Sequence, residues 1–502
     1  MENIHWAELL AERVIKEKKE PYIVSAGITT SGPAHLGTLC EFLFPGTIKS
    51  VIEKKGKEAK FYFIADILDA FDSIPVSMQK YEKELSPYLG KPLCDVPDPT
   101  GESKSFGDYF LDEVRELMKK FGIEAEIIRV NEIYMEGRFD NYARIFLKNE
   151  SQAKEIVERT SGKTEKKDWS PIMPICEKCG KIATTRVLSH DSESYEYVCD
   201  KDVKYTKGCG HTGKAKISDH KYKIVWRLHW PSWMDLFKTS AEGAGVDHHT
   251  KGGSWDTLVA VFKEMFKKEP PIGYKYGFIL FQGKKYSKSK GIGMGVSEMI
   301  KLLPPEMIRY ILLKPDLQEN IDIDPTPQNL LRVFEDFEGA IRLLEKKPEE
   351  LARSEEKRVA ALKLSTEKIN WKAQFLDMVL YYQVHNDWKK VGEVLEDPEG
   401  VEYLKNYAQE WIQKEFLPEE YNFKYKPTKS EGEVGEFIQE LEENSDALEI
   451  HNSVFEFSKS KGIEPKEMFR KIYLALIGKE KGPRIGKLIY ALGVKRVKKD
   501  LV

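Results

Sequence analysis

The sequence predicts an α/β protein with a parallel sheet, interrupted by a small cysteine-containing insertion and followed by an all-α region. Short apolar runs alternate with helical patterns from Pro21 to about residue 160. Lysine, glycine and cysteine replace that pattern over residues 161–220, and beyond Thr326 nearly every pattern has helical spacing. At roughly 150 residues per domain, the chain of 502 residues is long enough for about three domains.

The composition is typical of a folded protein with buried cores. Lys and Arg total 79 against 82 Asp and Glu, which gives a net charge of −3, and 11% of the residues are aromatic. This excludes a disordered chain and argues against a protein that coats nucleic acid along its whole surface. No apolar run approaches the ~20 residues that a membrane helix needs, so we expect no membrane partner and a cytoplasmic location. Six cysteines in so long a chain are not a disulfide framework.

Apolar runs and helical spacing alternate on both sides of the insertion. Before it, helical spacing is clear in Phe110, Val114, Leu117 and Phe121, and after it the α/β pattern resumes at Trp226. Strands that alternate with helices form a parallel sheet with crossover connections. The expected strands are residues 22–26, 59–66, 126–130 and 276–281, and the expected helices include residues 38–53, 254–266 and 302–314.

A glycine-rich bend with a histidine joins the first expected strand to the first expected helix. Gly27, Gly32 and Gly37 allow the backbone to approach a ligand closely. The free N–H groups of a helix N-terminus suit a phosphate. His35 lies in the same bend and could donate a hydrogen bond to a phosphate oxygen as charge builds in a transition state. The alternative is an ordinary turn in which His35 only caps the helix.

A lysine- and serine-rich segment follows the expected strand at 276–281. Its residues 284–291 read KKYSKSKG, with lysines at Lys285 and Lys288 on either side of Ser287. Cationic, hydroxyl-bearing side chains beside a sheet edge suit a leaving triphosphate. The alternative is a basic loop that only faces solvent, which is the commoner outcome for a run of charge.

Four of the six cysteines cluster in the insertion. Cys176 and Cys179 form a C-x₂-C pair, and Cys199 and Cys209 follow. Four thiolates suit a closed, tetrahedral, structural Zn²⁺, and nothing in the pattern indicates the open position of a catalytic zinc. His211 could replace Cys209 as the fourth ligand, with Asp202 a weaker substitute. Four free thiols are the remaining alternative.

The two segments together resemble the signatures of the class I aminoacyl-tRNA synthetases. HLGT at 35–38 is similar to HIGH, and KYSKS at 285–289 is similar to KMSKS, in the expected order. Flanking segments resemble the class I lysyl-tRNA synthetase family across nearly the whole chain. These segments are SAGITTSGPAHLG (25–37), FIADILDAFDSIP (63–75), VPDPTG (96–101), WRLHWPSWM (226–234), GVDHHTKGGSWDT (245–257), YGFILFQGKKYSKSKG (276–291) and GPRIGKLIYALG (482–493).

The resemblance implies a fold and an activity. The implied fold is a Rossmann-type catalytic domain in two halves, 1–160 and 223–325, with a zinc-binding insertion at 161–222 and an all-α anticodon-binding domain at 326–502. The implied activity is ATP-dependent ligation of L-lysine to tRNA(Lys) through a lysyl-adenylate, with Mg²⁺ as the counterion of ATP. The implied catalytic residues are His35, Gly37, Lys285 and Lys288, and ATP would contact these residues and Ser287.

The substrate residues come partly from the resemblance and partly from chemistry. The resemblance carries lysine recognition onto Gly27, Thr29, Trp226, His248 and Tyr276. Glu41, in the helix after the bend, is our own candidate for the ε-ammonium, with a surface acid as the alternative. Asp66 ends the second expected strand and Asp69 begins the connection after it. Both are candidates for the α-ammonium or a ribose, because ligands bind at the carboxyl ends of parallel strands, and local capping is the alternative. Trp226 has the alternative of being a core aromatic residue.

Some positions depart from the family pattern. Thr38 and Tyr286 replace residues of the two signatures, His229 stands where Asp is expected, and Val246 stands where Lys is expected. The segment after VPDP lacks Cys and His, so we expect no second metal site there. The last stretch, 479–499, is basic and is a candidate RNA contact.

Other activities and assemblies stay open at this point. A class I synthetase for another amino acid, a smaller nucleotidyltransferase and an RNA-binding paralogue without aminoacylation activity are the alternatives. A monomer is favoured over an oligomer. No residue-level anticodon code is visible in the sequence.

Overall fold

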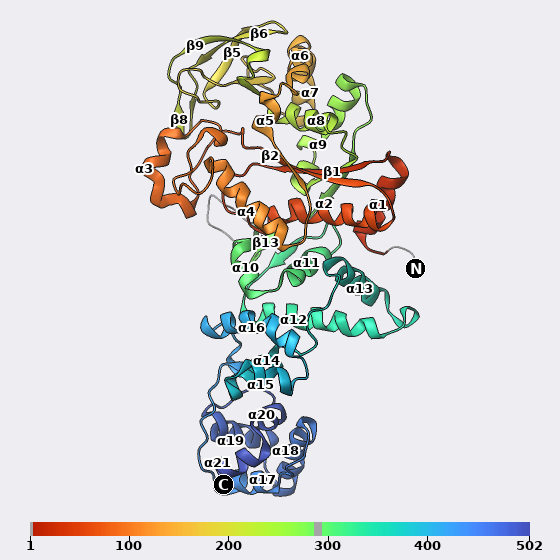
Figure 1. Ribbon diagram of the computed structural model, residues 1–502, viewed down its shortest axis with the longest axis vertical. Coiled ribbons are helices and arrows are strands. Elements are labelled where there is room, and N and C mark those ends of the chain that lie inside the picture. The colour runs from red at the N-terminus through yellow and green to blue at the C-terminus, as the bar shows by residue number, and fades with distance from the viewer. Residues whose placement is uncertain (1–3, 286–293) are drawn as a thin grey trace. The chain divides into compact units, whose positions relative to one another are not determined.

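The computed structural model describes residues 4–285 and 294–502, which Figure 1 shows as a ribbon. The chain forms two compact units. The first comprises Met1–Met299, Arg309–Ile323 and Ala352–Ser365, and the second comprises Ile300–Ile308, Asp324–Leu351 and Thr366–Val502. Among the described residues, no helix combines the length and the apolar character that spanning a bilayer requires.

A five-stranded parallel sheet in the order β12-β11-β1-β2-β3 forms the centre of the first unit, as the alternating pattern predicts. After β1 the chain adds β2 and then β3 on one side of that strand. It later adds β11 and β12 on the other side of β1. The order of the strands therefore reverses between β1 and β11, and in parallel sheets a ligand binds in the crevice outside the carboxyl ends of the strands at such a reversal. The strands are β1 Tyr22–Ile28, β2 Ala59–Ala65, β3 Glu126–Arg129, β11 Ala241–Gly245 and β12 Ile272–Tyr276.

Helices cover both faces of this sheet. In Figure 1, α1 and α2 lie on one side of it and α8 and α9 on the other, and α2 packs directly on β1, β2 and β11. The strand β1 is buried on both faces over residues 22–26, which explains its continuous apolar run, whereas β2 has the exposed Lys60 near its start and is buried on both faces only toward its end. The helices of this part of the chain are α1 Trp6–Glu17, α2 Leu36–Lys54, α3 Glu82–Leu85, α4 Phe106–Lys120, α5 Val130–Met135, α6 Asp140–Lys148, α7 Glu150–Ser161, α8 Trp226–Leu236, α9 Ser254–Ala260, α10 Val296–Leu302, α11 Pro305–Leu313 and α13 Arg353–Ser365.

One expected strand is wrong in its extent. Residues 276–281 are divided between β12 and β13, Ile279–Phe281, which belongs to a second sheet. The chain leaves the first sheet where the Gly277 N–H donates to the Leu317 carbonyl at 3.0 Å. A Cβ at Gly277 would lie 2.2 Å from the Glu319 carbonyl oxygen, so the close backbone approach requires glycine.

Two expected helices also differ in detail, whereas the helix expected at 38–53 is confirmed as α2. Residues 254–266 form α9 and then a π-helical turn, Val261–Phe266. The run 302–314 is interrupted, because Pro304 and Pro305 disfavour a helical conformation in the residues that precede them. The chain therefore ends α10 at Leu302 and begins α11 after it.

The insertion is a small β module. Its three-stranded antiparallel sheet has the order β5-β6-β9, and two short pairs, β7 with β8 and β4 with β10, complete it. The strands are β4 Ile172–Pro174, β5 Thr185–His190, β6 Ser194–Cys199, β7 Asp202–Val203, β8 Thr206–Lys207, β9 Thr212–Lys216 and β10 Tyr222–Ile224. The module packs on the α/β core through buried tyrosines, including Tyr195 and Tyr222, which meet edge to face.

A further small sheet has the order β14-β13-β15. Its outer strands are β14 Lys284–Lys285 and β15 Ile321–Ile323. The serine- and lysine-rich segment begins at β14, but its residues Tyr286, Ser287 and Lys288 lie outside the described residues.

The second unit is helical, as its pattern predicts, and its described residues contain no strand. Its core includes Phe334, which stacks on Phe375 at 3.9 Å between ring centroids, and Trp411, which meets both rings edge on. The further helices are α12 Pro327–Arg342, α14 Phe375–His385, α15 Trp388–Val394, α16 Pro398–Gln413, α17 Glu433–Glu440, α18 Ala447–Lys461, α19 Pro465–Ile477, α20 Ile485–Leu492 and α21 Val494–Leu501.

Candidate active site

The candidate substrate residues gather at the carboxyl edge of the sheet, beside the reversal of strand order. Gly27 is the penultimate residue of β1, Asp66 directly follows β2, and Tyr276 ends β12. His248 lies in the turn after β11, and Trp226 is the first residue of α8. Strands that are far apart in the sequence therefore bring these side chains to one crevice.

His35 occupies the N-terminus of α2, where free backbone N–H groups point out of the helix. Its Nδ1 accepts a hydrogen bond from the Thr38 N–H at 3.1 Å, so the capping role considered from the sequence is present. The close approach of the ring explains Gly37, because a Cβ there would lie 2.9 Å from His35 Cε1. The bend thus combines a fixed imidazole with the helix end that favours phosphate.

The chain after the serine- and lysine-rich segment returns to this bend. Gly295 forms an antiparallel backbone bridge with His35, and the Val296 N–H donates to the Ala34 carbonyl at 3.0 Å. Glu113 of α4 joins the same two segments. Its carboxylate accepts the Ala34 N–H at 3.0 Å and the Ser297 hydroxyl at 3.1 Å. Described residues after the KYSKS-like segment are therefore held directly beside the HLGT segment.

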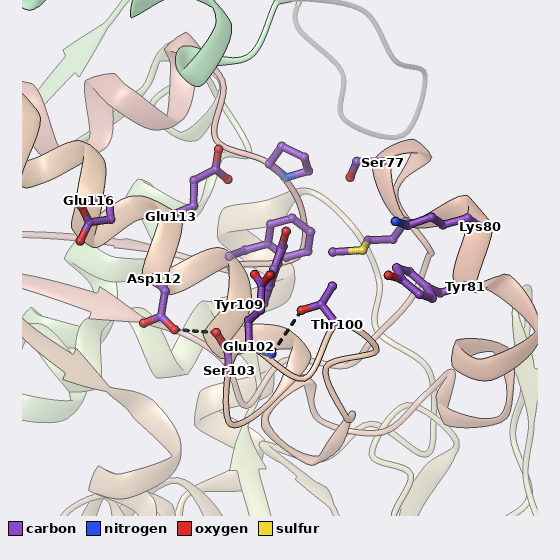
Figure 2. A pocket seen from close by; sticks show the side chains of 13 residues that line it. Ser77, Lys80, Tyr81, Thr100, Glu102, Ser103, Tyr109, Asp112, Glu113 and Glu116 are labelled. Atoms are coloured by element: carbon purple, nitrogen blue, oxygen red, sulfur yellow. Dashed lines mark hydrogen bonds between the residues drawn. The ribbon is translucent and has the colours of Figure 1, made fainter.

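An acidic pocket of about 540 Å³ lies beside the bend, and Glu113 is one of the residues that line it (Figure 2). Its wall includes Pro33 of the bend and the α4 residues Asp112 and Glu116. Figure 2 also shows Asp112 accepting the Ser103 hydroxyl, at 2.7 Å. Among the described lining residues there are four carboxylates and one lysine, a balance that repels a triphosphate. No pattern in the sequence predicts this pocket.

Glu41 and Tyr276 form a pair across the crevice wall. The Tyr276 hydroxyl donates a hydrogen bond to Glu41 Oε1, and Phe44 packs edge to face on the Tyr276 ring at 5.3 Å. Burial, reinforced by the Glu41 carboxylate, raises the pKa of Tyr276 well above its ordinary value. The phenol therefore keeps its proton, and Glu41 is oriented by it rather than being a simple surface acid.

Asp66 and Asp69 both contact the ammonium group of Lys223. The Lys223 side chain, 1% exposed, lies 2.7 Å from Asp66 Oδ2 and also donates to Asp69. Thr29 donates its hydroxyl to Asp69 at 2.5 Å. Burial alone would raise the pKa of Asp66, but Lys223 and His229 outweigh it and hold that pKa well below its ordinary value. Asp66 is only 2% exposed, so Asp69 is the carboxylate of the pair that reaches the crevice.

The role of Lys223 was not predicted from the sequence. Its neighbours could have indicated a buried ion pair. Lys223 lies in β10 between the buried residues Tyr222 and Ile224, and a buried lysine needs an anionic partner. His229, one of the departures from the family pattern, lies fully buried with Nδ1 3.6 Å from Asp66. Burial lowers the pKa of His229, so the ring is neutral at pH 7.

Three tryptophans of α8 form a layered wall behind the crevice. Trp226 is 38% exposed and stacks on the buried Trp230 with an angle of 14° between the rings. The hydroxyl of Ser254 contacts both Trp226 Nε1 at 3.4 Å and His248 Nδ1 at 3.0 Å. A Cβ at Gly27 would lie 2.9 Å from Trp233, so the end of β1 rests directly on this wall. Trp226 thus presents the accessible aromatic face.

The four cysteines of the insertion form a compact group. Cys176, Cys179, Cys199 and Cys209 place their sulfur atoms within 4.8 Å of one another, and two of the pairs are 3.7 Å apart. Tetrahedral Zn²⁺ with bonds of about 2.3 Å requires sulfur atoms about 3.8 Å apart, so the donor set fits this metal. Cys209 belongs to the group, whereas His211 Nε2 bonds instead to Glu177 at 2.7 Å.

Comparisons with known proteins agree with this architecture. The family described as tRNA synthetases class I (K) matches residues 4–367, and the family described as anticodon binding domain matches residues 399–501. The lysine--tRNA ligase of Archaeoglobus fulgidus is 32% identical over 99% of this chain and 99% of its own. The corresponding ligase of Picrophilus torridus is 32% identical over 98% of this chain and 97% of its own, and that of Methanocaldococcus jannaschii is 30% identical over 98% of both. The chain therefore belongs to the class I (K) family of tRNA synthetases.

Proposed function

We propose that this protein ligates L-lysine to tRNA(Lys) through a lysyl-adenylate, with release of pyrophosphate and then AMP. The observation that supports the proposal is that the HLGT bend follows β1, while the candidate lysine residues lie at or beside the carboxyl ends of β1, β2, β11 and β12. Relatives that match over nearly the whole chain and are named lysine--tRNA ligases support it.

Lysine would lie along the tryptophan wall of the crevice. Its ε-ammonium suits Glu41, whose carboxylate is oriented by Tyr276, because a carboxylate in a partly buried site discriminates strongly for a cation. Its apolar stem suits the exposed face of Trp226. His248, held by Ser254, lies against the same wall.

The other end of the substrate would bind at the strand ends. Asp69, with Thr29 bonded to it, offers a carboxylate to the α-ammonium, while Asp66 serves mainly to hold Lys223. Gly27 brings backbone groups of β1 to the same place. The lysine carboxylate then extends toward the α2 N-terminus, where ATP is expected.

ATP would bind at the bend, with His35 and Gly37 at the N-terminus of α2. Lys285, Ser287 and Lys288 would contact the triphosphate from the other side, as the resemblance implies. Mg²⁺ would accompany the triphosphate and neutralise part of its charge.

The lysine carboxylate attacks the α-phosphorus, the bond to the β-phosphate oxygen breaks, and pyrophosphate leaves with the electron pair. The terminal ribose hydroxyl of tRNA next attacks the lysyl carbonyl, loses its proton, and AMP leaves. Catalysis therefore consists of positioning and charge stabilisation more than acid–base chemistry.

The other parts of the chain would support this reaction. We assign a structural Zn²⁺ to the four cysteines of the 161–222 insertion and anticodon binding to the helical region from residue 326. The basic stretch 479–499, in which Tyr490 is 48% exposed, is the candidate RNA contact. A monomer in the cytoplasm is part of the same proposal.

A direct test is acylation of total tRNA with labelled amino acids. We expect lysine to be attached, and the charged species to be tRNA(Lys) when it is recovered and sequenced. Attachment of a different amino acid would replace the substrate, and binding of tRNA without any acylation would favour the RNA-binding alternative.

A further inference from the structure

A glutamate that no part of the proposed reaction uses lies beneath the tryptophan wall. Glu242 is the second residue of β11 and is 1% exposed. The sheet register places it beside Ser25 of β1, at the reversal of strand order. The chain offers it no cationic partner within the described residues, although an unpaired buried carboxylate is costly.

Glu242 is instead held by neutral donors. The Trp230 indole donates to Oε1 at 2.6 Å and the Trp233 indole to Oε2 at 3.3 Å. The Ser25 hydroxyl also donates to Oε2, and it lies 2.9 Å from the hydroxyl of Thr239. One carboxyl group therefore ties β1, β11 and α8 together.

The two indoles that Glu242 holds shape the candidate lysine site. Trp233 fills the space beside Gly27, where a Cβ would lie 2.9 Å from its ring. Trp230 stacks beneath Trp226 and meets the His248 ring at 5.6 Å. A rotation of either indole would displace the aromatic face or the strand end that the substrate is proposed to contact.

We propose that Glu242 is a positioning residue for the amino acid site, which fixes Trp230 and Trp233 so that Trp226, His248 and Gly27 face the substrate. The inference rests on the proposed function, because it assigns Glu242 to the same crevice. Glu242 itself contacts no substrate atom and acts through the indoles.

The protonation of Glu242 gives this role a distinctive pH dependence. Burial raises its pKa to about 7, against the opposing effect of its hydrogen bonds to Ser25, Trp230 and Trp233. The titratable group that faces it from β12 is Tyr274, whose own pKa burial raises well above the ordinary value. Below pH 7 a proton on one oxygen competes with the donors there, so the indoles are held less firmly. Amino acid binding should weaken as the pH falls through about 7.

The experiment compares Glu242→Ala and Glu242→Gln in the full-length protein. Lysine affinity is measured from tryptophan fluorescence, and KM for lysine and for ATP from pyrophosphate exchange. We expect Glu242→Ala to raise KM for lysine about tenfold, the effect of a lost buried hydrogen bond to a charged group, with KM for ATP changed less than about twofold. Glu242→Gln, whose amide NH₂ cannot accept a hydrogen bond from an indole, should bind lysine with the lower affinity that the wild type has at low pH, and should lose the dependence on pH near 7.

Glu338 provides a matched control. Burial also raises its pKa to about 7, but it accepts the Phe375 N–H within the helical unit. Glu338→Ala should lower thermal stability without a selective rise in KM for lysine. If Glu242→Ala does not fold, the pH profile of Glu242→Gln decides the question alone.

The inference is overturned if the Glu242 variants leave KM for lysine unchanged, if they raise both KM values equally, or if Glu242→Gln retains the pH dependence of the wild type. Pyrophosphate exchange by the wild type tests the proposed function independently of the Glu242 variants. A wild-type protein that activates another amino acid refutes lysine as substrate, and the same variants then test positioning with that amino acid. A wild-type protein that activates no amino acid refutes both.

Discussion

The hydroxyl of Tyr276 donates a hydrogen bond to the carboxylate of Glu41, which joins the end of β12 to the second turn of α2. Two elements that are separated by 235 positions in the sequence thereby present one oriented anion at the crevice. The pair explains the proposed preference for lysine, because a substrate with a neutral side chain would leave the Glu41 carboxylate without a cation.

Removing this charge should weaken lysine binding. We expect Glu41→Gln to raise KM for lysine by about 10- to 100-fold, the range for a hydrogen bond to a charged group, while Tyr276→Phe should cost less because the carboxylate stays. Steady-state pyrophosphate exchange gives both values. Glu53→Gln, in the exposed part of the same helix, is the control and should leave KM unchanged. If Glu41→Gln and Glu53→Gln changed KM for lysine equally, Glu41 would not be a residue of the lysine site.

Lys223 should be essential for stability. Replacing it with Met leaves Asp66 buried without its cation, which should lower the free energy of unfolding by about 3 to 5 kcal/mol. Denaturant titration measures this change. The double variant Lys223→Met with Asp66→Asn should recover part of the loss, since it removes the unpaired charge.

The pairing of Lys223 with Asp66 also predicts how the stability of the fold changes with pH. The pKa of Asp66 is depressed in the folded wild type, so its contribution is present above the unfolded value near 4 and is lost only at lower pH. In Lys223→Met the unpaired, buried Asp66 should have a raised pKa and destabilise the fold as the pH rises. The difference in stability between the two proteins should therefore be larger at pH 8 than at pH 5, and a constant difference would contradict the pairing.

Glu113 should affect the rate of activation more than lysine binding. Glu113→Ala loses the hydrogen bonds to Ala34 and Ser297, so the two segments beside His35 are held less firmly. We expect kcat for pyrophosphate exchange to fall about fivefold with KM for lysine unchanged. Glu113→Gln, which keeps an acceptor for the Ala34 N–H, should restore part of the rate. Glu116→Ala, one turn along the exposed side of α4, should match the wild type, and a rise in KM for lysine alone would contradict this role.

The cysteine cluster should hold zinc. Metal analysis of the purified protein should find about one zinc per chain, and Cys179→Ser should reduce both the zinc content and the thermal midpoint. Cys94→Ser changes a cysteine outside the cluster and should keep the zinc. A protein that contains no zinc yet has the same midpoint after chelation would show that the thiols are free.

The sequence predicted the parts of the fold that depend on local pattern. The run of β1 is continuous because both faces of most of this strand are buried, and the cysteine spacing alone indicated the cluster. The strand expected at 276–281 was wrong because Gly277 allows a turn into another sheet, which periodicity cannot reveal. The roles of Lys223 and Glu242 could not be assigned, because Asp66 lies 157 positions from Lys223 and Ser25 lies 217 positions from Glu242 in the sequence.

The central claim is that the crevice at the reversal of strand order activates lysine with ATP. The most direct measurement is ATP–pyrophosphate exchange with each amino acid in turn, with and without tRNA. We expect exchange that depends on lysine, and Lys288→Ala should lower its kcat more than it changes KM for lysine. Exchange that requires a different amino acid, or no exchange in either condition, would contradict the account.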